Sequence, residues 1–379
     1  MLKIHWFLPT GGDSRDVTPS DDGAPVRPPS LDYLGQIARA CDQLGFDAVL
    51  TPCGTGCEDS WITTAMLVPQ TSRLKFLVAM RPGLMSPTLA AQMASTYHRL
   101  SGGRILLNLV TGAEPRELHR FGDYADKDAR YARTGEFIDV VRGAWSGEEF
   151  DYSGEHYAVA GATTRAVPSP NPPEIYFGGA SEAAELVAAR GADVYLAWGE
   201  PPAMVAERVE RMRKLAAEAG RELRLGIRFH TIARPTSEEA WAEAARLQAA
   251  MSPEAIAAAR ADFESTMSEG QRRMAELSGA ALDGADLSDP RSLEIYPNVW
   301  SGVGLVRGGA GTAFVGSYCE VADRIAEYAE LGFEEFILSG YPHLEEAWWV
   351  GEGVLPELRR RGLLAELDDH NDAPVFHFR

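Results

Sequence analysis

Short apolar runs rich in β-branched residues alternate with amphipathic helical patterns along the chain, and this alternation constrains the fold most strongly. Each run is four to eight residues long, which is the usual length of a strand. We expect eight strands, at Lys3–Leu8, Ala48–Thr51, Leu74–Met80, Arg104–Val110, Glu174–Phe177, Val194–Trp198, Leu225–Ile232 and Glu335–Ser339. Strands that alternate with helices form a parallel sheet, and eight is the number that closes a barrel. The sequence therefore predicts an α/β fold, a (β/α)8 TIM barrel with insertions, with an open doubly wound sheet as the main alternative.

Helix-boundary signals agree with this rhythm. The helical pattern over Ser30–Leu44 starts with a plausible capping residue and stops before a glycine. Thr236 with Glu239, and Ser317 with Glu320, have the spacing of a capping box. We therefore expect helices to begin at these positions.

Two segments interrupt the alternation and are predicted to be insertions. Residues 252–312 are helical in pattern and then rich in Gly, Asp and Ser, and they lie between the seventh and eighth units. Residues 150–173 have the pattern of a β-hairpin followed by a Pro-rich loop. Long insertions in a compact domain usually act as lids or binding loops. We expect one barrel domain over residues 1–365 and a C-terminal tail over 366–379.

Composition limits the classes of function. The chain has 379 residues, of which 45% are hydrophobic, so it can bury a large core and enclose a pocket. Its formal net charge of −19 repels phosphate backbones and anionic lipid, which argues against a nucleic-acid or membrane role. An anionic substrate would therefore need a local cationic pocket.

The cysteine pattern and the first residues indicate a cytoplasmic protein. Four cysteines in a chain of this length are not a disulfide framework, so we expect reduced thiols. Met1–Pro9 has the pattern of a strand and lacks the features of a signal peptide. Cys53 and Cys57 lie beside acidic residues, but no second ligand pair has suitable spacing, so we expect no metal site.

Catalytic residues of a barrel lie at the C-terminal ends of strands and in the loops that follow. Applied to the expected strands, this rule selects Pro9–Arg15, Pro52–Glu58, Arg81, Asn108–Gly112, Gly178–Ser181, Trp198–Glu200, Arg228–His230 and Tyr341–His343. Arg228 and His230 alternate along the seventh strand, so their side chains point to one face. A cation on an interior face needs a partner, which is either an anionic ligand or a core carboxylate.

Two glycine-rich stretches could approach an anion. Phe177–Ser181 runs from the fifth strand into a helix, where backbone N–H groups and the helix N-terminus favour phosphate. A tight turn with a serine cap explains the same pattern and is favoured when the motif stands alone. Val303–Gly311 lacks the Lys-Ser/Thr pair of a Walker motif. A flexible loop that orders over an anion and a solvated linker explain it equally well.

Single side chains near the expected barrel mouth are further candidates. Cys53 is predicted to be a packed structural thiol, whereas Cys57 is predicted to be a free thiol that lines a pocket. His343 follows the eighth strand, where it could act in acid–base chemistry or orient a substrate. A structural histidine is the alternative.

Taken together, these segments resemble the two-component alkanesulfonate monooxygenases of the bacterial luciferase-like superfamily. The similarity covers about residues 1 to 355, and it is carried by Trp6–Thr10, Cys57–Asp59, Lys75–Pro82, Asn108–Gly112, Tyr176–Gly179, Trp198–Pro201, Gly226–His230, Val303–Gly311 and Leu338–Ala347. The Asn108–Gly112 motif is shared widely across the superfamily, while Val303–Gly311 and Leu338–Ala347 are more specific to the sulfonate branch.

The resemblance implies a luciferase-like TIM barrel that takes FMN as the co-substrate FMNH2, with O2, and converts an alkanesulfonate to an aldehyde and sulfite. A separate NAD(P)H-dependent FMN reductase would supply the reduced flavin, and a homo-oligomer (dimer or tetramer) is expected. By this resemblance the flavin would contact Asn108, Thr111, Arg130, Tyr131, Gly179, Ala180 and Ser181. Arg228 and Arg307 would hold the sulfonate or stabilise the peroxyflavin, and the pocket would be lined by Cys57, Trp198, His230, Tyr341 and His343.

One departure from the family leaves the substrate open. Known members carry a histidine after Pro9-Thr10, where this chain has Gly11, and Arg15 follows as a possible added cation. The alternatives are therefore another luciferase-like monooxygenase, acting on methanesulfonate, a sulfone or an alkane, or an F420-dependent oxidoreductase on the same barrel. A non-catalytic flavin- or sulfonate-binding protein is the alternative from a different class.

Overall fold

Eight parallel strands form the centre of the protein in a computed structural model that describes residues 1–18, 27–165, 171–264 and 266–367. Most of the predicted C-terminal tail, residues 368–379, lies outside the described residues. The barrel strands are β1 (Lys3–Phe7), β2 (Ala48–Thr51), β3 (Lys75–Met80), β4 (Ile105–Leu109), β7 (Ile175–Gly178), β8 (Val194–Trp198), β9 (Arg224–Arg234) and β13 (Glu335–Ser339). Each lies within two residues of the expected bounds.

These strands close into a barrel. Their hydrogen-bonded order is β9-β13-β1-β2-β3-β4-β7-β8, and β8 pairs again with β9, so the sheet has no free edge between them. All eight pairings are parallel. The predicted TIM barrel is therefore confirmed, and an open doubly wound sheet is excluded.

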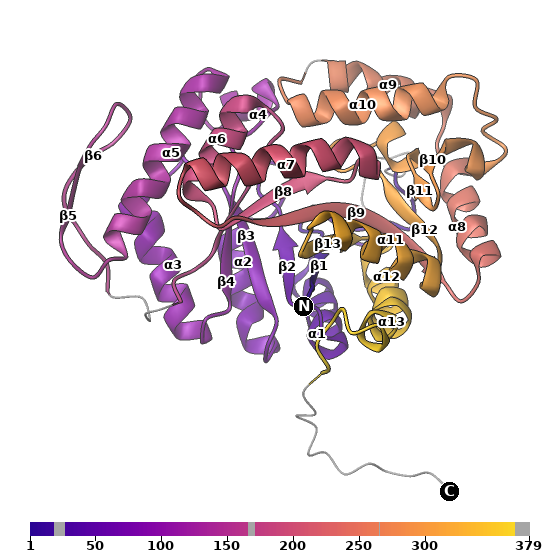
Figure 1. The fold of residues 1–379 in the computed structure, drawn as a ribbon, viewed down its shortest axis with the longest axis horizontal. Helices are drawn as coiled ribbons and strands as arrows, with labels where there is room; N and C mark the ends of the chain where they lie inside the picture. Colours follow the sequence, from indigo (N-terminus) through magenta and orange to yellow (C-terminus); the bar gives the residue numbers. More distant parts are fainter. Residues whose placement is uncertain (19–26, 166–170, 265, 368–379) are drawn as a thin grey trace, which may run out of the picture.

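Helices surround the barrel and begin where the sequence places caps (Figure 1). Ser30 accepts a hydrogen bond from the N–H of Tyr33, and both predicted capping boxes, at Thr236 and Ser317, are present. The surrounding helices are α1 (Leu31–Leu44), α2 (Ser60–Leu67), α3 (Pro87–Ser101), α4 (Pro115–Arg120), α5 (Lys127–Ala144), α6 (Glu182–Gly191), α7 (Pro202–Glu218), α8 (Ser237–Ala249), α11 (Tyr318–Leu331), α12 (His343–Trp349) and α13 (Leu355–Arg360). Short helical turns at Val68–Gln70, Pro290–Leu293 and Val350–Val354 complete the outer layer.

The interior of the barrel is layered because side chains alternate along each strand. The middle layer is apolar and consists mainly of Phe7, Ala48, Leu50, Leu77, Leu106, Tyr176, Val194 and Ile337. Strand pairing places Arg228 beside Trp198 and Ile337, at the C-terminal edge of this apolar layer. The packed middle layer therefore separates a charged mouth from the opposite end of the barrel.

A buried carboxylate closes that opposite end. Glu335 has no exposed surface and accepts hydrogen bonds from His5 (3.0 Å), Tyr176 (2.7 Å), Arg224 (2.6 Å) and Lys3 (3.3 Å). Burial alone would raise the pKa of Glu335, but His5, Lys3 and Arg224 outweigh burial and lower the pKa to about 2. Glu335 can stay ionised inside the barrel because these four hydrogen bonds stabilise its negative charge.

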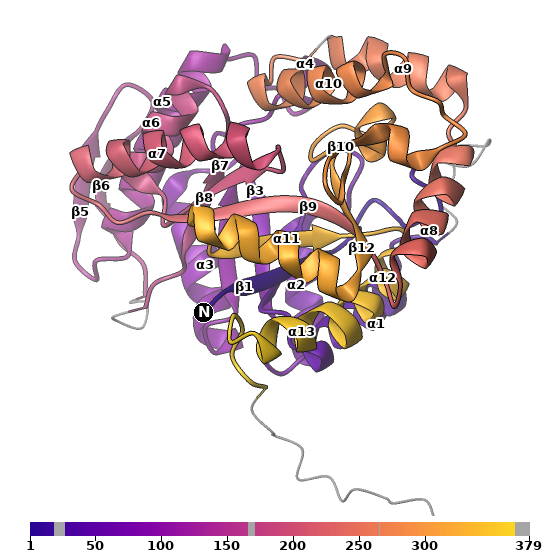
Figure 2. The same cartoon turned by 45° about the vertical axis from the view of Figure 1, so that its right-hand side comes forward.

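The longer insertion covers the mouth of the barrel. It contains α9 (Pro253–Glu264), α10 (Glu269–Leu282), β10 (Glu294–Tyr296), β11 (Val299–Trp300) and a turn of 3-10 helix, η3 (Gly302–Leu305). Figures 1 and 2 both place α9 and α10 on the side of the barrel away from the start of β1. This is the side on which the parallel strands end.

Strand β9 is longer than the expected Leu225–Ile232 because it continues beyond its partner β8. β8 pairs with β9 only as far as Arg228, and β12 (Ala313–Ser317) then pairs with His230–Arg234. β11 and β10 add to β12 as antiparallel strands. The sequence did not predict these three short strands, because their pairing depends on an edge that exists only in the folded barrel.

The shorter insertion is a two-stranded hairpin, β5 (Phe150–Ser153) with β6 (Ala158–Ala162). It projects away from the barrel beside α5 (Figure 1). The carboxylate of Glu136 on α5 accepts hydrogen bonds from the backbone N–H groups of Glu155, His156 and Tyr157, which fixes the hairpin turn.

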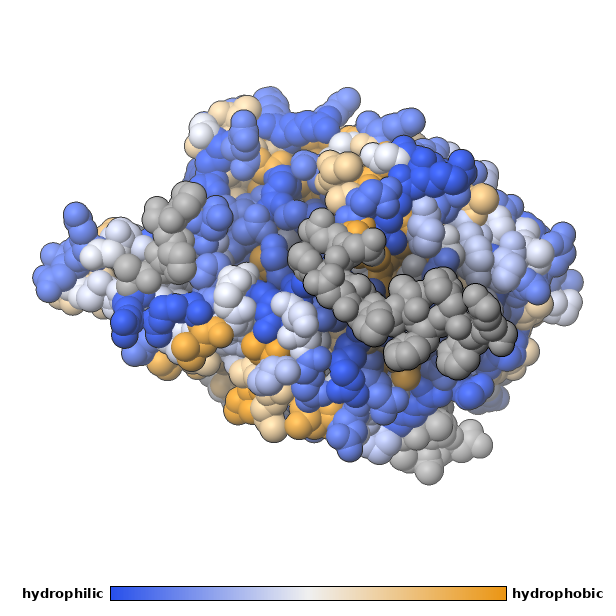
Figure 3. All heavy atoms as spheres, turned by 90° about the horizontal axis from the view of Figure 1, so that it is seen from below, coloured by the Kyte–Doolittle hydropathy of each residue, from blue (hydrophilic) through white to orange (hydrophobic). Residues whose placement is uncertain are grey.

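The surface is mostly hydrophilic on the face seen in Figure 3, with small hydrophobic patches near one edge. This distribution agrees with the net charge of −19. No helix within the described part of the chain is long and apolar enough to span a membrane.

Replacing Glu335 tests the closure of the barrel end. The pKa of Glu335 is about 2 in the folded protein, against about 4.3 for an unfolded glutamate, so ionisation stabilises the fold above about pH 4.3. Glu335→Gln should lower the free energy of unfolding at pH 7 by on the order of 3 kcal/mol. The difference from the wild type should narrow as the pH falls from about 4.3 towards about 2. Urea denaturation at pH 7 and pH 3.5 measures both effects.

Glu218→Gln is the matched control, since Glu218 is 61% exposed and lies 3.9 Å from Lys214 in a surface ion pair. It should change stability little at either pH. Equal effects of the two substitutions would contradict a structural role for the buried carboxylate.

Candidate active site

A cavity of about 310 Å³ opens at the C-terminal ends of the strands. Its wall includes eight of the residues predicted for the site, namely Asn108, Thr111, Arg130, Tyr131, Gly179, Ala180, Trp198 and Arg228. Residues not predicted for it, among them Phe7, Lys127 and Met267–Gly270 at the start of α10, complete the wall. The mouth of the barrel and the insertion therefore enclose the cavity together.

One wall of this cavity carries a buried arginine. Arg130 lies in the first turns of α5 and is 2% exposed. Its Nη1 donates to the carbonyl oxygen of Ala125, while its Nε has no partner among the described residues. Burial lowers the pKa of Arg130, and no carboxylate lies close enough to form an ion pair within the described chain. A buried, incompletely bonded guanidinium of this kind is suited to an anion.

The turn between β7 and α6 lies on the same wall. Gly179 has φ +151°, and a Cβ there would lie 2.6 Å from the Cβ of Ala184 and 3.5 Å from the Oη of Tyr131. The contact with Ala184 leaves no room for a Cβ, so glycine is required at this position. Ser181 is the N-cap of α6, as the tight-turn interpretation predicts. Gly178, Gly179 and Ala180, just before this helix, nevertheless line the cavity, where backbone N–H groups can be donated to an anion.

Arg228 lies at the centre of the mouth. Its guanidinium carbon is 4.5 Å from the centroid of the Phe7 ring, and its Nε has no hydrogen-bond partner among the described residues. The side chain is half-buried and lines the cavity. Burial and then the charge of Arg307 lower the pKa of Arg228 to about 10. The core-carboxylate partner considered for Arg228 is therefore absent from the described residues.

Other arginines at the mouth, unlike Arg228, form ion pairs with carboxylates. Arg208 and Arg273 both pair with the carboxylate of Glu200, at 3.2 and 2.6 Å, and Arg81 pairs with Glu117. Among the described residues, Arg130, Arg228 and Arg307 form no such ion pair. The mouth thus carries an excess of positive charge inside a protein whose net charge is negative.

His230 is held as a neutral ring with a fixed tautomer. Its Nε2 lies 3.0 Å from the carbonyl oxygen of Ala310, which can only accept, so Nε2 carries the proton. Its Nδ1 therefore accepts from the hydroxyl of Ser339 at 2.9 Å. Burial, followed by the charges of Arg228 and Arg307, holds the pKa of His230 well below its usual value. With both nitrogens bonded, this histidine positions the Ala310 segment rather than presenting a free base.

Arg307 lies beside the cavity on a packed turn. Its guanidinium carbon is 5.5 Å from the centroid of the Tyr341 ring, which in turn stacks on His230. The stretch predicted to be a flexible loop or linker is largely buried, because η3 packs into the insertion and Gly304 and Gly311 are in backbone contact. Composition alone suggested mobility, but small residues here allow two backbone segments to approach closely.

Asp13 was missed as a functional residue, although the barrel rule selects its loop. Its carboxylate accepts from the Nδ1 and the backbone N–H of His343, both at 2.8 Å, and from the hydroxyl of Tyr33. Burial would raise the pKa of Asp13, but the bonds from His343 and Tyr33 lower it. The Nδ1 of His343 is thus the protonated nitrogen, and its buried Nε2 has no partner among the described residues. Asp13 fixes the tautomer of a histidine whose other nitrogen is available.

The remaining predicted residues lie around this cluster. The ring of Tyr341 is 5.3 Å from that of His343, and its buried hydroxyl has no hydrogen bond of acceptable geometry within the described part of the chain. Burial raises the pKa of the Cys57 thiol, and Arg307 lies near enough to oppose that shift. Cys53 lines the cavity, and burial raises its pKa to about 11. Both thiols are therefore weak nucleophiles in this structure.

Gly11, where the sequence departs from the proteins that it resembles, lies in a tightly packed loop. A Cβ at Gly11 would lie 2.9 Å from the carbonyl oxygen of Gly56 and 3.9 Å from the sulfur of Cys57. The first loop is therefore pressed against the loop that carries Cys57. Arg15 is exposed, so the structure does not place this possible added cation in the cavity.

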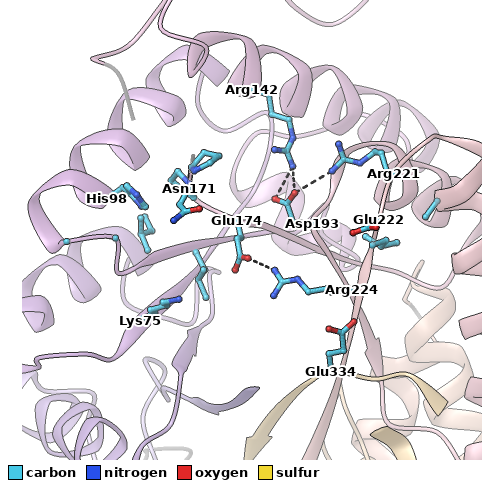
Figure 4. Close-up of a pocket in the computed structure, with 18 of the residues that line it drawn as sticks. Lys75, His98, Arg142, Asn171, Glu174, Asp193, Arg221, Glu222, Arg224 and Glu334 are labelled. Carbon is cyan, nitrogen blue, oxygen red and sulfur yellow. Dashed lines mark hydrogen bonds and ion pairs between the residues drawn. The ribbon is translucent and has the colours of Figure 1, made fainter. Parts of the chain in front are cut away.

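A larger cavity of about 1270 Å³ lies at the N-terminal ends of the strands, away from the predicted residues. Figure 4 shows Arg142 and Arg221 directed at the carboxylate of Asp193, and Arg224 directed at Glu174. The labelled cations with dashed contacts are thus already paired. Since barrel enzymes carry their chemistry at the other end, we assign this cavity a structural role.

No group of three or more His, Cys, Asp or Glu within the described residues could hold a metal ion. The mouth instead offers a phosphate-like anion site at Arg130 and the β7–α6 turn, and a second cationic centre at Arg228 and Arg307. Two neutral histidines lie beside the second centre. This arrangement suits a ligand with a phosphate together with a second, smaller anion.

Replacing Asp13 tests its hold on His343. Burial lowers the pKa of His343 and the carboxylate of Asp13 opposes that shift, so Asp13→Asn should lower the pKa further. Histidine ring NMR signals, followed over the pH range in which the protein stays folded, measure it, and His343→Gln assigns the signal. Asp16→Asn is the control, because Asp16 pairs with Arg246 at 2.6 Å and does not contact the histidine. An unchanged or raised pKa of His343 in Asp13→Asn would refute the assignment.

Comparison with known proteins identifies the family. The chain matches the luciferase-like monooxygenase family over residues 2–335. It is similar to the solved structures of riboflavin lyase with modified FMN and riboflavin (TM-score 0.78, 23% identity, covering 96% of this chain and 93% of that one) and of EDTA monooxygenase from Chelativorans sp. BNC1 (TM-score 0.77, 20% identity, 96% and 95%). A long-chain alkane monooxygenase is similar to the same degree (TM-score 0.77, 19% identity, 97% and 93%). At these identities the structures support the fold alone, while the match over most of the sequence shows that the chain belongs to the luciferase-like monooxygenase family.

Proposed function

We propose that the protein is an FMNH2-dependent monooxygenase that converts an alkanesulfonate to an aldehyde and sulfite. The observation that carries the proposal is the pair Arg228 and Arg307, two cations at one mouth without a carboxylate partner among the described residues. Two guanidinium groups that repel each other are stable together when an anion lies between them. The natural occupant is therefore the anionic group of a substrate.

A sulfonate fits this centre for chemical reasons. It stays ionised at every physiological pH, and its three oxygens match the planar donor set of arginine. The apolar ring of Phe7 beside Arg228 suits the alkyl chain. An alkane would leave both cations without a counter-charge, and a neutral sulfone would compensate them only weakly. The charges thus favour a sulfonate over these two alternatives.

The other anion site fits the phosphate of FMN. Arg130, with its unpartnered Nε, and the close backbone at Gly179 form a cradle that a Cβ would fill. Tyr131 on α5 directs its hydroxyl toward Gly179, and Ser181 is the N-cap of α6. Asn108, Thr111 and Ala180 line the cavity. These residues would hold the flavin, and reduced flavin, when bound, supplies the electrons that activate O2. Overall, RCH2SO3⁻, O2 and FMNH2 give RCHO, HSO3⁻, FMN and H2O.

The residues of the chain contribute binding, charge and proton control. Arg228 and Arg307 orient the sulfonate and stabilise negative charge as the carbon–sulfur bond breaks. His343, with Asp13 on Nδ1, presents an unprotonated Nε2 that can accept a proton. The α10 insertion covers the mouth and reduces contact of the reacting groups with water. Assembly into a homo-oligomer stays a prediction.

Sulfite release from a panel of sulfonates tests the proposed function. The protein is mixed anaerobically with FMNH2, and O2 is then added with methanesulfonate, longer alkanesulfonates, dimethyl sulfone or an alkane. We expect sulfite from one or more alkanesulfonates. Oxidation of the sulfone or the alkane without sulfite release would contradict the sulfonate assignment while leaving a monooxygenase.

Replacing Arg228 measures the contribution of the anion centre. Arg228→Ala should reduce sulfite release by roughly two to three decades, because a charge-assisted bond in a dry site contributes about 2–4 kcal/mol to transition-state stabilisation. Arg228→Lys should restore activity only partly, since an ammonium lacks the guanidinium fork. FMNH2 affinity and the melting temperature serve as controls. Near-normal sulfite release by Arg228→Ala with saturating FMNH2 would remove the central support for the proposal.

A reductase partner predicts a preference between flavin redox states. If a separate NAD(P)H-dependent FMN reductase delivers FMNH2, the protein should bind FMNH2 more tightly than FMN, because the reduced flavin must be captured and the oxidised flavin released. Anaerobic fluorescence titration with each flavin measures this difference. Equal affinities, or tighter binding of FMN, would count against the two-component arrangement.

A further inference from the structure

We infer that Gln271, in the insertion, is a positioning residue that holds Arg307 at the mouth of the barrel. This inference rests on the proposed function, in which Arg307 binds the sulfonate. Gln271 lies on the first turn of α10 and is 7% exposed. Its Oε1 accepts a hydrogen bond of 2.7 Å from the backbone N–H of Gly309, two residues after Arg307. The buried amide of Gln271 is therefore hydrogen-bonded to the backbone of the turn that carries Arg307.

The turn is fixed at several points, and Gln271 supplies a bond from α10. The N–H of Arg307 donates to the carbonyl oxygen of Val303 at 3.1 Å, and His230 holds the carbonyl oxygen of Ala310 from inside the barrel. Gly309 has φ +92°, a backbone conformation that favours glycine. Without the bond to Gln271, the exposed Gly308 and the half-buried Gly309 would lose their hydrogen bond to α10. Arg307 could then leave the ring of Tyr341.

The position of Gln271 is itself set by the cavity wall. Directly before it, Gly270 packs on the indole of Trp198, where a Cβ would lie 3.1 Å from the ring. The N–H of Met267 donates to the carbonyl oxygen of Ala113 at 3.2 Å, next to the loop that follows β4. The first turn of α10 therefore contacts the loop after β4, Trp198 at the end of β8, and the Arg307 turn. Gln271 connects the proposed flavin side of the mouth to the sulfonate side.

The test compares variants of two buried glutamines. Gln271→Met removes the acceptor at nearly the same length, and Gln271→Glu keeps an acceptor oxygen. Gln248→Met is the matched control, because Gln248 is 5% exposed on α8 and donates from Nε2 to the carbonyl oxygen of Leu287 at 2.8 Å. Both methionine variants should lose similar thermal stability, so a difference between them reports on the Arg307 turn and not on general destabilisation.

Two readouts distinguish positioning from stability. In Gln271→Met, limited trypsin digestion followed by mass spectrometry should show cleavage after Arg307 about tenfold faster than in the wild type, because the turn has lost a hydrogen bond. The KM for the sulfonate should rise about fivefold to tenfold, with the Kd for FMNH2 unchanged. Gln271→Glu should restore most of both properties, and Gln248→Met should change neither.

The outcomes separate this inference from the proposed function. If the wild type releases no sulfite from any sulfonate, the proposed function fails, while the trypsin experiment still decides the role of Gln271. If cleavage after Arg307 is as slow in Gln271→Met as in the wild type, or if Gln248→Met behaves like Gln271→Met, the positioning role is wrong.

Discussion

Backbone pairing along β9 determines where the charged groups of the mouth lie. The strand pairs with β13 on one edge and with β8 on the other, and beyond Arg228 it exchanges β8 for β12. The pairing with β8 closes the barrel, and the pairing with β12 brings the insertion against the mouth. Because side chains alternate along the strand, Arg228 and His230 both point inward, at the level where the apolar interior ends. Their chemistry follows from the register of this one strand.

The register of β9 also places a positive charge at the mouth, on Arg228, that forms no ion pair with a carboxylate of the described residues. At the opposite end of the barrel, Glu335 accepts hydrogen bonds from four side chains. At the mouth, Arg208 and Arg273 form ion pairs with Glu200. Arg228, by contrast, is a half-buried cation near Arg307, and both desolvation and the charge of Arg307 lower the pKa of Arg228. Placing an unpaired charge in a low-dielectric site destabilises the free protein. An anionic ligand offsets that cost on binding, so the unpaired cations favour affinity for an anionic substrate. Because the net charge of the whole chain is −19, an anionic substrate needs such local attraction.

The sequence predicted the barrel well because each strand and cap has a local signal. Ser30, Thr236 and Ser317 begin helices through bonds within a single turn, and the apolar runs needed no knowledge of their partners. The barrel rule also selected the loop that contains Asp13, but not its role, since Asp13 and His343 meet only after the barrel closes. The prediction of a mobile stretch around Arg307 agreed least with the structure. Its glycines suggested mobility, whereas the structure uses them for close packing of Gly304 on Gly311. Contacts between distant segments, such as Gln271 with Gly309, leave no local pattern.

The account depends on an anion bound between Arg228 and Arg307, and a crystal structure of the protein with FMN and a long-chain alkanesulfonate tests this claim most directly. We expect the sulfonate oxygens within about 3 Å of both guanidinium groups, with the alkyl chain toward Phe7 and the FMN phosphate at Arg130 and Gly179. A sulfonate bound elsewhere, with Arg228 paired to a carboxylate of the protein itself, would contradict the account.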